Sequence, residues 1–590
     1  MPPPRPNTHP RFQLFTPITP RQCPQSTLKP KRWRALLEGY PDRDFPKILE
    51  NIARYGARVG YEGPHIRIRG RNHSSAYRIS DEISDNIASE VTAGRLIPIT
   101  ETSLPPAFFI SPLGAVEKKA NGQRTGWRRI HDLSFPHSSS VNDGIPKHYG
   151  TLQYQTLDDA IKLITSAGRY SKLRKHDLED AFRMIPVSPY DYWLFVFEWN
   201  NTLYVDIFLP FGLRTSPFIF NLFAEGLHWI LEHVFHRQLV HYLDDFLLVN
   251  DPDPEFFGQL ASYLGFYEKV SKRADGYQAD FLGIELDTDA MQARLPPDKQ
   301  ARALAAVQSL LQLDRVTHCT LERLLGFLSF CTRVLPLGRP FLRNLFTFLN
   351  RLSHIHPHAT ARINAAAKRD LQWWSTFLPC WSGIQMISAA PRKHIHLYTD
   401  ASGVKGIGGW FSSNAFSARV PRSHRGRHID WKEAYAIVFA FAQWSALWHN
   451  CLVEIHCDNQ TIVSAIKSQS IRGPAIDLLQ ALFLVTTLDN IKIQATWLSS
   501  QDNWIADALS RFEFSKIANI FPQFLDPFNR RRHSGSPMSA LKARLRNSFG
   551  TLSPPLPEHN TKQVLLVTNN SQPCTATPPS RPPSYLSRTG

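Results

Sequence analysis

The stretch His241-Tyr242-Leu243-Asp244-Asp245-Phe246 places two adjacent carboxylates between apolar runs. Residues 239–240 and 246–249 are apolar, which predicts two short buried strands with the acid pair in the hairpin turn between them. Like charges held against an apolar sheet are costly unless a cation neutralises them, and Mg²⁺ takes carboxylate oxygens as ligands. An ordinary surface turn is the alternative interpretation, because Asp also favours turns.

A further acid, Asp177, precedes this pair, and the turn-like stretch 209–217 lies between them. With Phe281-Leu282-Gly283 downstream, this order of motifs resembles the palm of a retroelement reverse transcriptase. Residues 131–145 resemble more closely the DIRS-like elements, retrotransposons that integrate with a tyrosine recombinase. The resemblance covers residues 33–511.

The resemblance implies a right-hand polymerase with fingers, palm and thumb, in which Asp177, Asp244 and Asp245 hold two Mg²⁺ ions, with Mn²⁺ as the alternative metal. Phe182 matches the family's steric gate against a ribose 2′-hydroxyl. Lys272 matches the lysine that protonates the leaving pyrophosphate, and Lys269 competes for that role. The residues that the resemblance places at the incoming nucleotide are Lys118, Lys119, Arg128, Phe182, Phe211, Gly212 and Lys272.

Lys118, Lys119 and Arg128 lie in a predicted hairpin over residues 105–131, with its turn at Asn121-Gly122. Such a hairpin can close over a triphosphate and neutralise it. A solvated hairpin is the alternative. The alternating basic stretch 65–71 predicts a strand that either meets a phosphate backbone or is an edge strand protected by its charges.

A second acidic constellation follows residue 391, where the pattern alternates between strand and helix. Asp400 and Asp458 end predicted strands, while Glu433 and Asp507 fall on predicted helices over 430–448 and 504–512. Ligands gather at the carboxyl ends of strands in open α/β sheets, so we expect the four acids to converge around two Mg²⁺ ions. The alternatives are a capping-box role for Glu433, three residues after Asp430, and a helix-dipole role for Asp507.

These acids and their neighbours resemble the ribonuclease H domain that retroelements fuse behind their polymerase. The matching stretches are 399–402, 431–433, 457–459 and 506–511. Related domains often carry a mobile histidine shortly before the last aspartate, and residues 496–501 contain none. Slow product release or slow metal exchange is the expected consequence.

Bulk composition limits the function classes. The chain has 590 residues and a formal net charge of +17, which favours nucleic acid as partner and an anionic membrane next. We expect no transmembrane helix, because no run of about twenty apolar residues occurs. Seven scattered cysteines without a Cys-x-x-Cys pair predict free thiols in a reducing compartment, the cytoplasm or the nucleus.

The fold class expected is a multidomain α+β and α/β chain. The predicted parts are a disordered Pro-rich N-terminus (1–31), a small helical region (32–104), fingers and palm (105–290), a helical thumb or connection (291–390), a ribonuclease H-like domain (391–515) and a mostly disordered basic tail (516–590). His354, His356 and His358 are interpreted as a solvent loop, since no carboxylate or cysteine completes a metal set. The arginine run at 530–533 is interpreted as a solvated linker.

The leading hypothesis is an RNA-directed DNA polymerase with ribonuclease H, made by a retrotransposon and acting on an RNA template, a DNA primer, RNA–DNA hybrid and dNTPs. A catalytically degenerate, nucleic-acid-binding remnant of such an element is the alternative. A pararetrovirus-type replicase would share both sites, but residues 131–145 disfavour it. An element-encoded recombinase is a further expected partner, although this chain carries no signature of one.

Overall fold

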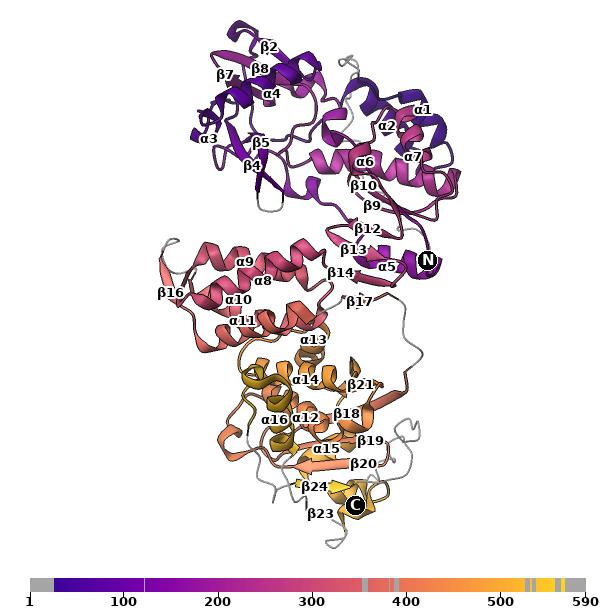
Figure 1. Cartoon of the computed structure of the whole chain (residues 1–590), viewed down its shortest axis with the longest axis vertical. Helices are drawn as coiled ribbons and strands as arrows, with labels where there is room; N and C mark the ends of the chain where they lie inside the picture. The colour runs from indigo at the N-terminus through magenta and orange to yellow at the C-terminus, as the bar shows by residue number, and fades with distance from the viewer. Residues whose placement is uncertain are drawn as a thin grey trace, which may run out of the picture. The chain divides into compact units, whose positions relative to one another are not determined.

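The computed structural model describes residues 26–120, 123–352, 359–380, 383–386, 392–525, 531–532, 537–557 and 564–567. The chain divides into two compact units, Met1–Pro296 with Gln385–Ile387, and Pro297–Ile384 with Ser388–Gly590. Both units contain helices and strands (Figure 1), so the predicted α+β and α/β multidomain class is confirmed. None of the described helices has the length and apolarity that crossing a bilayer requires.

A five-stranded sheet in the order β1-β3-β7-β8-β2 forms one part of the first unit. Its strands are β1 (Arg67–Arg69), β2 (Leu96–Ile99), β3 (Phe108–Ile110), β7 (Val196–Trp199) and β8 (Thr202–Asp206). Strand β1 is an edge strand, and Arg69 pairs with Glu101 at 2.8 Å and Glu198 at 3.2 Å. These protein partners favour the protected-edge interpretation of residues 65–71 over a phosphate contact.

Residues 32–104, predicted as a separate small helical region, are built into this first unit. They supply β1 and β2 to the sheet, and four helices: most of α1 (Pro30–Leu36), and α2 (Phe45–Tyr55), α3 (Ser74–Tyr77) and α4 (Ser80–Thr92). Trp33 is fully buried and its ring meets Phe223 edge-on, 5.3 Å between centroids. The apolar face of α2, with Leu49 and Ile52, joins the same core.

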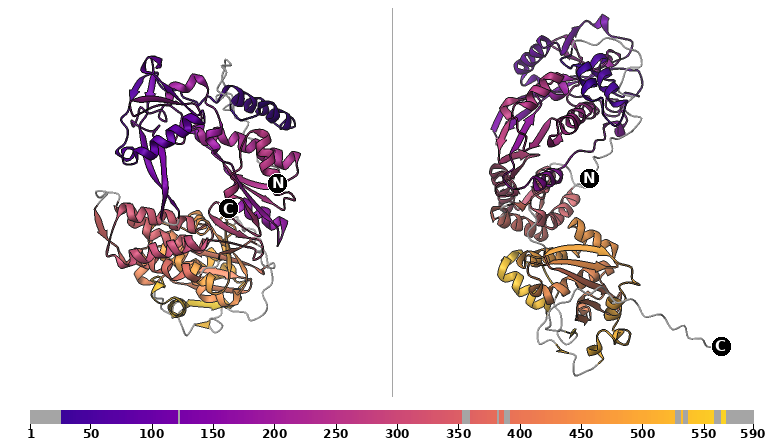
Figure 2. Two further views of the ribbon diagram at one scale, coloured as in Figure 1. Left: turned by 45° about the horizontal axis from the view of Figure 1, so that its top comes forward. Right: turned by 90° about the vertical axis from the view of Figure 1, so that its right-hand side faces the viewer.

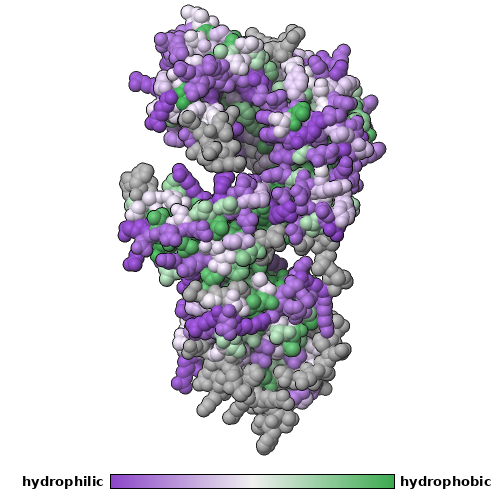
Figure 3. Space-filling model, viewed as in Figure 1, coloured by the Kyte–Doolittle hydropathy of each residue, from purple (hydrophilic) through white to green (hydrophobic). Residues whose placement is uncertain are grey.

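The predicted hairpin over residues 105–131 is present as β4 (Leu113–Ala120) and β5 (Gln123–His131), paired antiparallel with a register shift between Lys118 and Lys119. The turn at Asn121-Gly122 lies outside the described residues. Hydrophilic residues cover most of the face of this unit in Figure 3, as expected for a chain of high net charge.

A four-stranded sheet in the order β11-β6-β10-β9, called the acidic sheet below, carries the first acids. Its strands are β6 (Leu173–Asp177), β9 (Gln238–Tyr242), β10 (Asp245–Val249) and β11 (Ala274–Gly276). Helices α5 (Leu157–Ala167), α6 (Ser216–Trp229) and α7 (Phe256–Leu264) accompany it, and a third sheet follows as β12 (Gln278–Phe281), β13 (Ile284–Asp287) and β14 (Gln292–Arg294). The apolar run 246–249 is buried, as predicted.

Helix α6 begins at Ser216 after Thr215 as N-cap, and the Ser216 hydroxyl donates to the Pro210 carbonyl at 2.9 Å. A π-helical turn over Ile230–Val234 continues the helix; Ile230 and Leu231 are buried in the core, whereas Val234 is 38% exposed.

Four helices lie side by side at the start of the second unit: α8 (Pro297–Gln312), α9 (His318–Cys331), α10 (Arg343–Leu352) and α11 (Ala365–Phe377), seen from three directions in Figures 1 and 2. The short strands β15 (Arg315–Thr317) and β16 (Thr360–Arg362) pair beside them. Strand β17 (Ile384–Gln385) follows in sequence and is the fourth strand of the third sheet, next to β14. The histidines at 354, 356 and 358 lie outside the described residues.

The rest of the second unit is built on a seven-stranded sheet in the order β22-β21-β18-β19-β20-β24-β23. Its first five strands by sequence are β18 (His394–Ala401), β19 (Ile407–Phe411), β20 (Asn414–Ala418), β21 (Leu452–Cys457) and β22 (Lys492–Trp497). Helices α12 (Ile429–Trp444) and α15 (Trp504–Arg511) both contact β18 and β19, and α13 (Gln460–Ser468) and α14 (Ile476–Leu488) pack nearby. Strands β18, β21 and β22 run parallel.

The expectation of a mostly disordered tail after residue 515 is partly wrong. Helix α16 (Pro537–Phe549) packs on α12 and buries Met538, Leu541 and Leu545, which share one face by helical spacing. Strand β24 (Val564–Val567) pairs with β20, and β23 (Arg531–Arg532) pairs with β24. Arg530 and His533 of the arginine run, like residues 568–590, lie outside the described part of the chain.

Candidate functional site

The three acids of the acidic sheet meet at one end of two neighbouring strands. Asp177, the last residue of β6, lies directly opposite Asp245, the first residue of β10. Asp244 precedes it in the turn, where Leu243 takes a left-handed conformation (φ 53°) and the Leu178 amide donates to the Asp244 carbonyl at 3.1 Å. The predicted convergence of Asp177, Asp244 and Asp245, called the acidic triad below, is thus present in the structure.

Burial and mutual repulsion make this triad a place for cations. Burial, followed by the charges of Asp177 and Asp245, raises the pKa of Asp244 to about 6. Burial also raises the pKa of Asp245, with Asp177 adding to the rise and Lys175 opposing it. Negative charge is therefore concentrated here beyond what the protein alone neutralises.

Two lysines supply part of the missing positive charge. Lys272 Nζ lies 2.6 Å from Asp177 Oδ2, and Lys175 Nζ lies 3.3 Å from Asp245 Oδ1. The competing Lys269 contributes its backbone amide, which donates to the Asp177 carbonyl at 2.8 Å. The Lys272 side chain is half exposed and can leave its partner, so the three carboxylates fit a hard divalent ion such as Mg²⁺.

Several of the residues predicted at the nucleotide lie close to one another. The ring of Phe182 lies 5.4 Å from that of Phe211, and the Arg128 guanidinium lies 5.9 Å from the centroid of the Phe211 ring. Gly212 has φ 100°, a conformation that glycine favours. The structure thus brings together Arg128 of the hairpin, Phe182 and the turn at residues 211–212. The side chains of Lys118 and Lys119 lie outside the described part.

Asn142 holds this turn in place, a role that sequence reasoning missed. Its Nδ2 donates to the Gly212 carbonyl at 2.8 Å and to Ser134 Oγ at 2.9 Å, while its Oδ1 accepts from the Arg214 amide at 2.8 Å. The residue is buried although it lies in a loop. The sequence feature that could have indicated this role is its position in residues 140–145, a stretch that resembles the family.

Phe182 is likewise supported by a buried ion cluster that no local pattern reveals. The neighbouring Arg183 donates to Glu90 Oε2 and to Asp206 Oδ1, each at 2.6 Å. Arg95 binds the other Glu90 oxygen at 2.7 Å. Because Glu90 is far from Arg183 in sequence, only the fold shows this support.

The second set of acids, Asp400, Glu433, Asp458 and Asp507, is called the acidic quartet below. Asp400 lies near the end of β18, and Asp458 directly follows the neighbouring strand β21. Glu433 on α12 accepts from the Ala401 amide at 3.1 Å, and Asp507 on α15 is close enough to Asp400 to repel it. The predicted convergence of all four residues is therefore present.

Electrostatics at the quartet resemble those at the triad but are stronger. Burial, opposed by a hydrogen bond with Ser510 and reinforced by Asp458 and Asp507, raises the pKa of Asp400 to about 7. Burial and the charges of Asp400 and Asp458 raise the pKa of Glu433 well above its ordinary value. Asp400 Oδ2 is buried without a hydrogen-bond partner, which fits an oxygen kept for a metal ion.

The structural alternatives for these acids can now be judged. The N-cap of α12 is His428, and Glu433 binds the β18 backbone instead of the helix start, so the capping-box alternative is wrong. Asp507 does lie in the first turn of α15 and pairs with Arg511 at 2.5 Å. Residues 496–501, the stretch without the family's histidine, include Ser500. Its hydroxyl donates a hydrogen bond to Asp458 Oδ2 at 2.7 Å.

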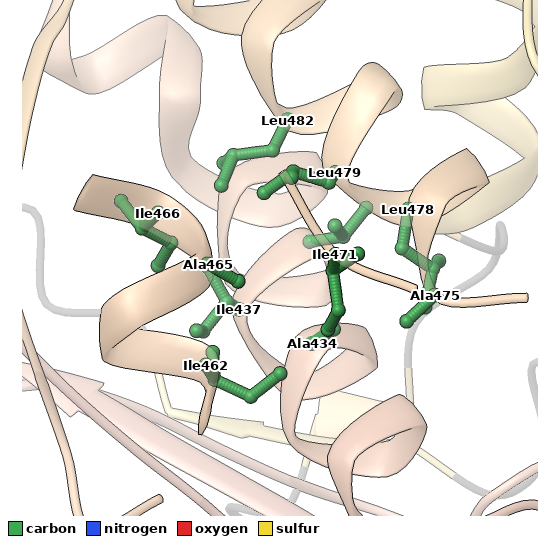
Figure 4. A pocket seen from close by; sticks show the side chains of 11 residues that line it. Ala434, Ile437, Ile462, Ala465, Ile466, Ile471, Ala475, Leu478, Leu479 and Leu482 are labelled. Atoms are coloured by element: carbon green, nitrogen blue, oxygen red, sulfur yellow. The ribbon is translucent and has the colours of Figure 1, made fainter. Parts of the chain in front are cut away.

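An apolar pocket lies beside the quartet's helix rather than at the acids. Figure 4 shows its lining side chains, which come from α12, α13, α14 and the segment before α14. Ala434 and Ile437 of α12 face Ile462 of α13 and Leu482 of α14 across it. Since every lining residue is apolar, the pocket offers no group that could bind nucleic acid or a metal ion. Its lining residues belong to the apolar packing of α12, the helix that carries Glu433.

A pH dependence of stability follows from the Asp400 pKa. The folded protein keeps a proton on Asp400 up to about pH 7, whereas the unfolded chain releases it near 3.8. This contribution to stability is therefore full below pH 3.8 and is lost as pH rises through 7. Without Mg²⁺, we expect the second unit to lose a few kcal/mol between about pH 5.5 and pH 8, measured by thermal unfolding.

Asp400→Asn should flatten this profile, and Mg²⁺ should restore stability at the higher pH. Equal pH profiles for wild type and Asp400→Asn would contradict the assignment.

Comparisons with known proteins agree with the first of these sites. Residues 128–270 match the family model of reverse transcriptase (RNA-dependent DNA polymerase). The chain is 20% identical over 432 residues to the retrovirus-related Pol polyprotein from transposon opus of Drosophila melanogaster, covering 68% of this chain and 40% of that protein. It is 29% identical over 255 residues to the Pol polyprotein of an ovine maedi visna related virus, covering 40% of this chain and 21% of the other.

Among solved structures, a foamy viral protease-reverse transcriptase in complex with RNA/DNA hybrid aligns with a TM-score of 0.44 and 14% identity, covering 81% of this chain and 64% of that one. The chain spans less than half the length of the two Pol polyproteins it matches. It contains a reverse transcriptase domain of the type found in retroelement and retroviral Pol proteins.

Proposed function

We propose that this chain is an RNA-directed DNA polymerase with an attached ribonuclease H, encoded by a DIRS-like retrotransposon. The observation that carries the polymerase half is the pairing of Asp177 with Asp245 across β6 and β10, with Asp244 in the adjoining turn. These residues all fall within the matched segment 128–270. The DIRS-like assignment rests on residues 131–145, and such an element supplies a recombinase as a further partner.

In the polymerase reaction, Asp177, Asp244 and Asp245 hold two Mg²⁺ ions, or Mn²⁺ in their place. When bound, the metal lowers the pKa of the primer 3′-hydroxyl and offsets charge on the leaving pyrophosphate. Lys272, released from Asp177, donates a proton to that leaving group. Arg128 and the backbone at 211–212 position the incoming dNTP over an RNA template and a DNA primer.

In the nuclease reaction, the acidic quartet holds two Mg²⁺ ions beside an RNA–DNA hybrid. Bound metal supplies an activated water for cleavage of the RNA strand. Ser500 fixes the Asp458 carboxylate and Arg511 fixes Asp507, so these two acids are oriented before substrate arrives. The site recognises RNA through its 2′-hydroxyls. Both reactions belong to the cytoplasm or the nucleus, where template and nucleotides occur.

Primer extension with purified protein tests the proposal. A DNA primer on an RNA template should be extended with dNTPs and Mg²⁺, and a chelator should stop extension. Salt-sensitive binding of the duplex without any extension would instead identify a degenerate remnant.

The packing of Phe182 predicts its effect on sugar selection. Phe182→Ala should increase ribonucleotide incorporation relative to deoxyribonucleotide incorporation by about 10- to 200-fold, because the ring no longer blocks the 2′-hydroxyl. The measurement is single-nucleotide incorporation with matched dNTP and rNTP. Phe235→Ala is the control, since Phe235 is also half-buried but packs on Phe256 instead. Unchanged selectivity in Phe182→Ala would remove this residue from the nucleotide site.

A further inference from the structure

Three histidines and a glutamate lie together on one face of the seven-stranded sheet. They precede Asp400 and Asp458 of the acidic quartet along strands β18 and β21. His394 and His396 alternate along β18 and so point to the same side of the sheet. Glu454 and His456 alternate in the same way along β21, which runs parallel beside β18 (Figure 1). The register places His396 next to Glu454.

The donor atoms of these side chains are spaced like the ligands of one metal ion. Glu454 Oε2 lies 3.2 Å from His394 Nε2 and 3.4 Å from His396 Nδ1. Donors bound at about 2.0–2.1 Å in a tetrahedral zinc site are roughly 3.3 Å apart. The ligand atoms of these three residues all lie within 4.8 Å of one another.

His456 lies beside this set of three, although it is not one of the residues whose donor atoms all lie within 4.8 Å of one another. His456 Nε2 lies 3.1 Å from His396 Nδ1 and 4.0 Å from Glu454 Oε2. Its ring stacks on that of Tyr398, 4.5 Å between centroids and 13° between planes, which holds the imidazole in one orientation.

The carboxylate is oriented by a neighbour on the third parallel strand. Thr496 on β22 donates its hydroxyl to Glu454 Oε1 at 2.7 Å, which leaves Oε2 directed at the histidines. Hydrogen-bonded support of this kind is typical of metal ligands. The side chains of His394 and His396 are 42% and 36% exposed, so an ion can enter from solvent.

We propose that His394, His396 and Glu454 form a Zn²⁺ site, with His456 beside it as the nearest further donor. Imidazole donors suit Zn²⁺, whereas the all-carboxylate triad and quartet suit Mg²⁺. The ion cross-links β18 and β21, the two strands whose carboxyl ends carry Asp400 and Asp458. The site therefore stabilises the framework of the quartet without taking part in its chemistry.

Metal content of the purified full-length chain, made without a histidine tag, tests this proposal. The protein is dialysed against Zn²⁺ in excess Mg²⁺, and bound zinc is measured by plasma mass spectrometry. We expect about one Zn²⁺ per chain, and visible absorption typical of tetrahedral coordination when Co²⁺ replaces it. The double variant His394→Gln/His396→Gln should bind Zn²⁺ at least about 100-fold more weakly.

Two controls separate this site from the rest of the protein. His449→Gln removes an exposed histidine outside the cluster and should retain the ion. Asp400→Asn alters the quartet and should also retain it, so the zinc result is independent of the nuclease assignment. Unfolding of the double variant in chelator should match that of wild type, which shows that it folds.

Equal zinc content in wild type and the double variant would overturn the proposal, as would a wild-type chain that retains no Zn²⁺.

Discussion

Asp244→Asn is expected to abolish primer extension, with a loss of at least about 10³-fold in the rate of nucleotide addition. The substitution keeps the shape of the side chain but removes a charge from the triad, where Asp177 and Asp245 alone must then hold the metal. A thousandfold loss corresponds to roughly 4 kcal/mol of transition-state stabilisation, the scale expected for a metal ligand. Single-turnover extension on an RNA template measures it.

Asp289→Asn provides the matched control for this variant. Asp289 lies in the same unit and is exposed, with only a surface ion pair to Arg169 at 3.3 Å. Its loss should leave extension within about twofold, because exposed pairs contribute little. Asp244→Asn should retain duplex binding, since the basic surface is unchanged. If extension by Asp244→Asn equals that of wild type, the triad is not the polymerase site.

Asp400→Asn separates the two activities. Cleavage of the RNA strand in an RNA–DNA hybrid should fall by at least about 10³-fold, because the buried Oδ2 that fits a metal ion is replaced by an amide. Primer extension should stay within about twofold, since the triad belongs to the other compact unit. A labelled hybrid assayed alongside extension of the same preparation gives both rates.

Glu513→Gln is the control for the quartet. Glu513 follows α15, is not one of the four acids, and pairs with Lys516 at 2.5 Å and Lys405 at 3.5 Å. Hybrid cleavage should be retained in this variant. Loss of both activities in Asp400→Asn would indicate misfolding, and undiminished cleavage would rule out the quartet as the nuclease site.

The acids of both sites could be predicted because each lies in a short sequence motif whose residue types are typical of metal binding. Asp244 and Asp245 lie between apolar runs, and Asp400 and Asp458 each lie at the end of a predicted strand. Such short motifs can be recognised without knowledge of the fold. The order of the motifs along the chain then predicted which acids come together, which no single motif shows.

What could not be predicted depends on contacts between distant segments. The ion cluster of Arg183 with Glu90 and Asp206 exists only when three elements meet. Strand β19 was not among the predicted strands, because its glycines favour loops. These glycines are explained by the packing of the strand. A Cβ at Gly408 would come within 2.5 Å of Leu509 on α15, so glycine allows the close approach that brings Asp507 to Asp400.

The seven-stranded sheet can form completely only after strand β24 has been synthesised. This strand hydrogen-bonds along β20, which otherwise ends the ordered series of strands on that side. An uncovered strand edge offers unpaired backbone groups to any passing chain. During synthesis, β20 leaves the ribosome long before β24, so the nascent chain has an unpaired strand edge at β20 until residues 564–567 have been made.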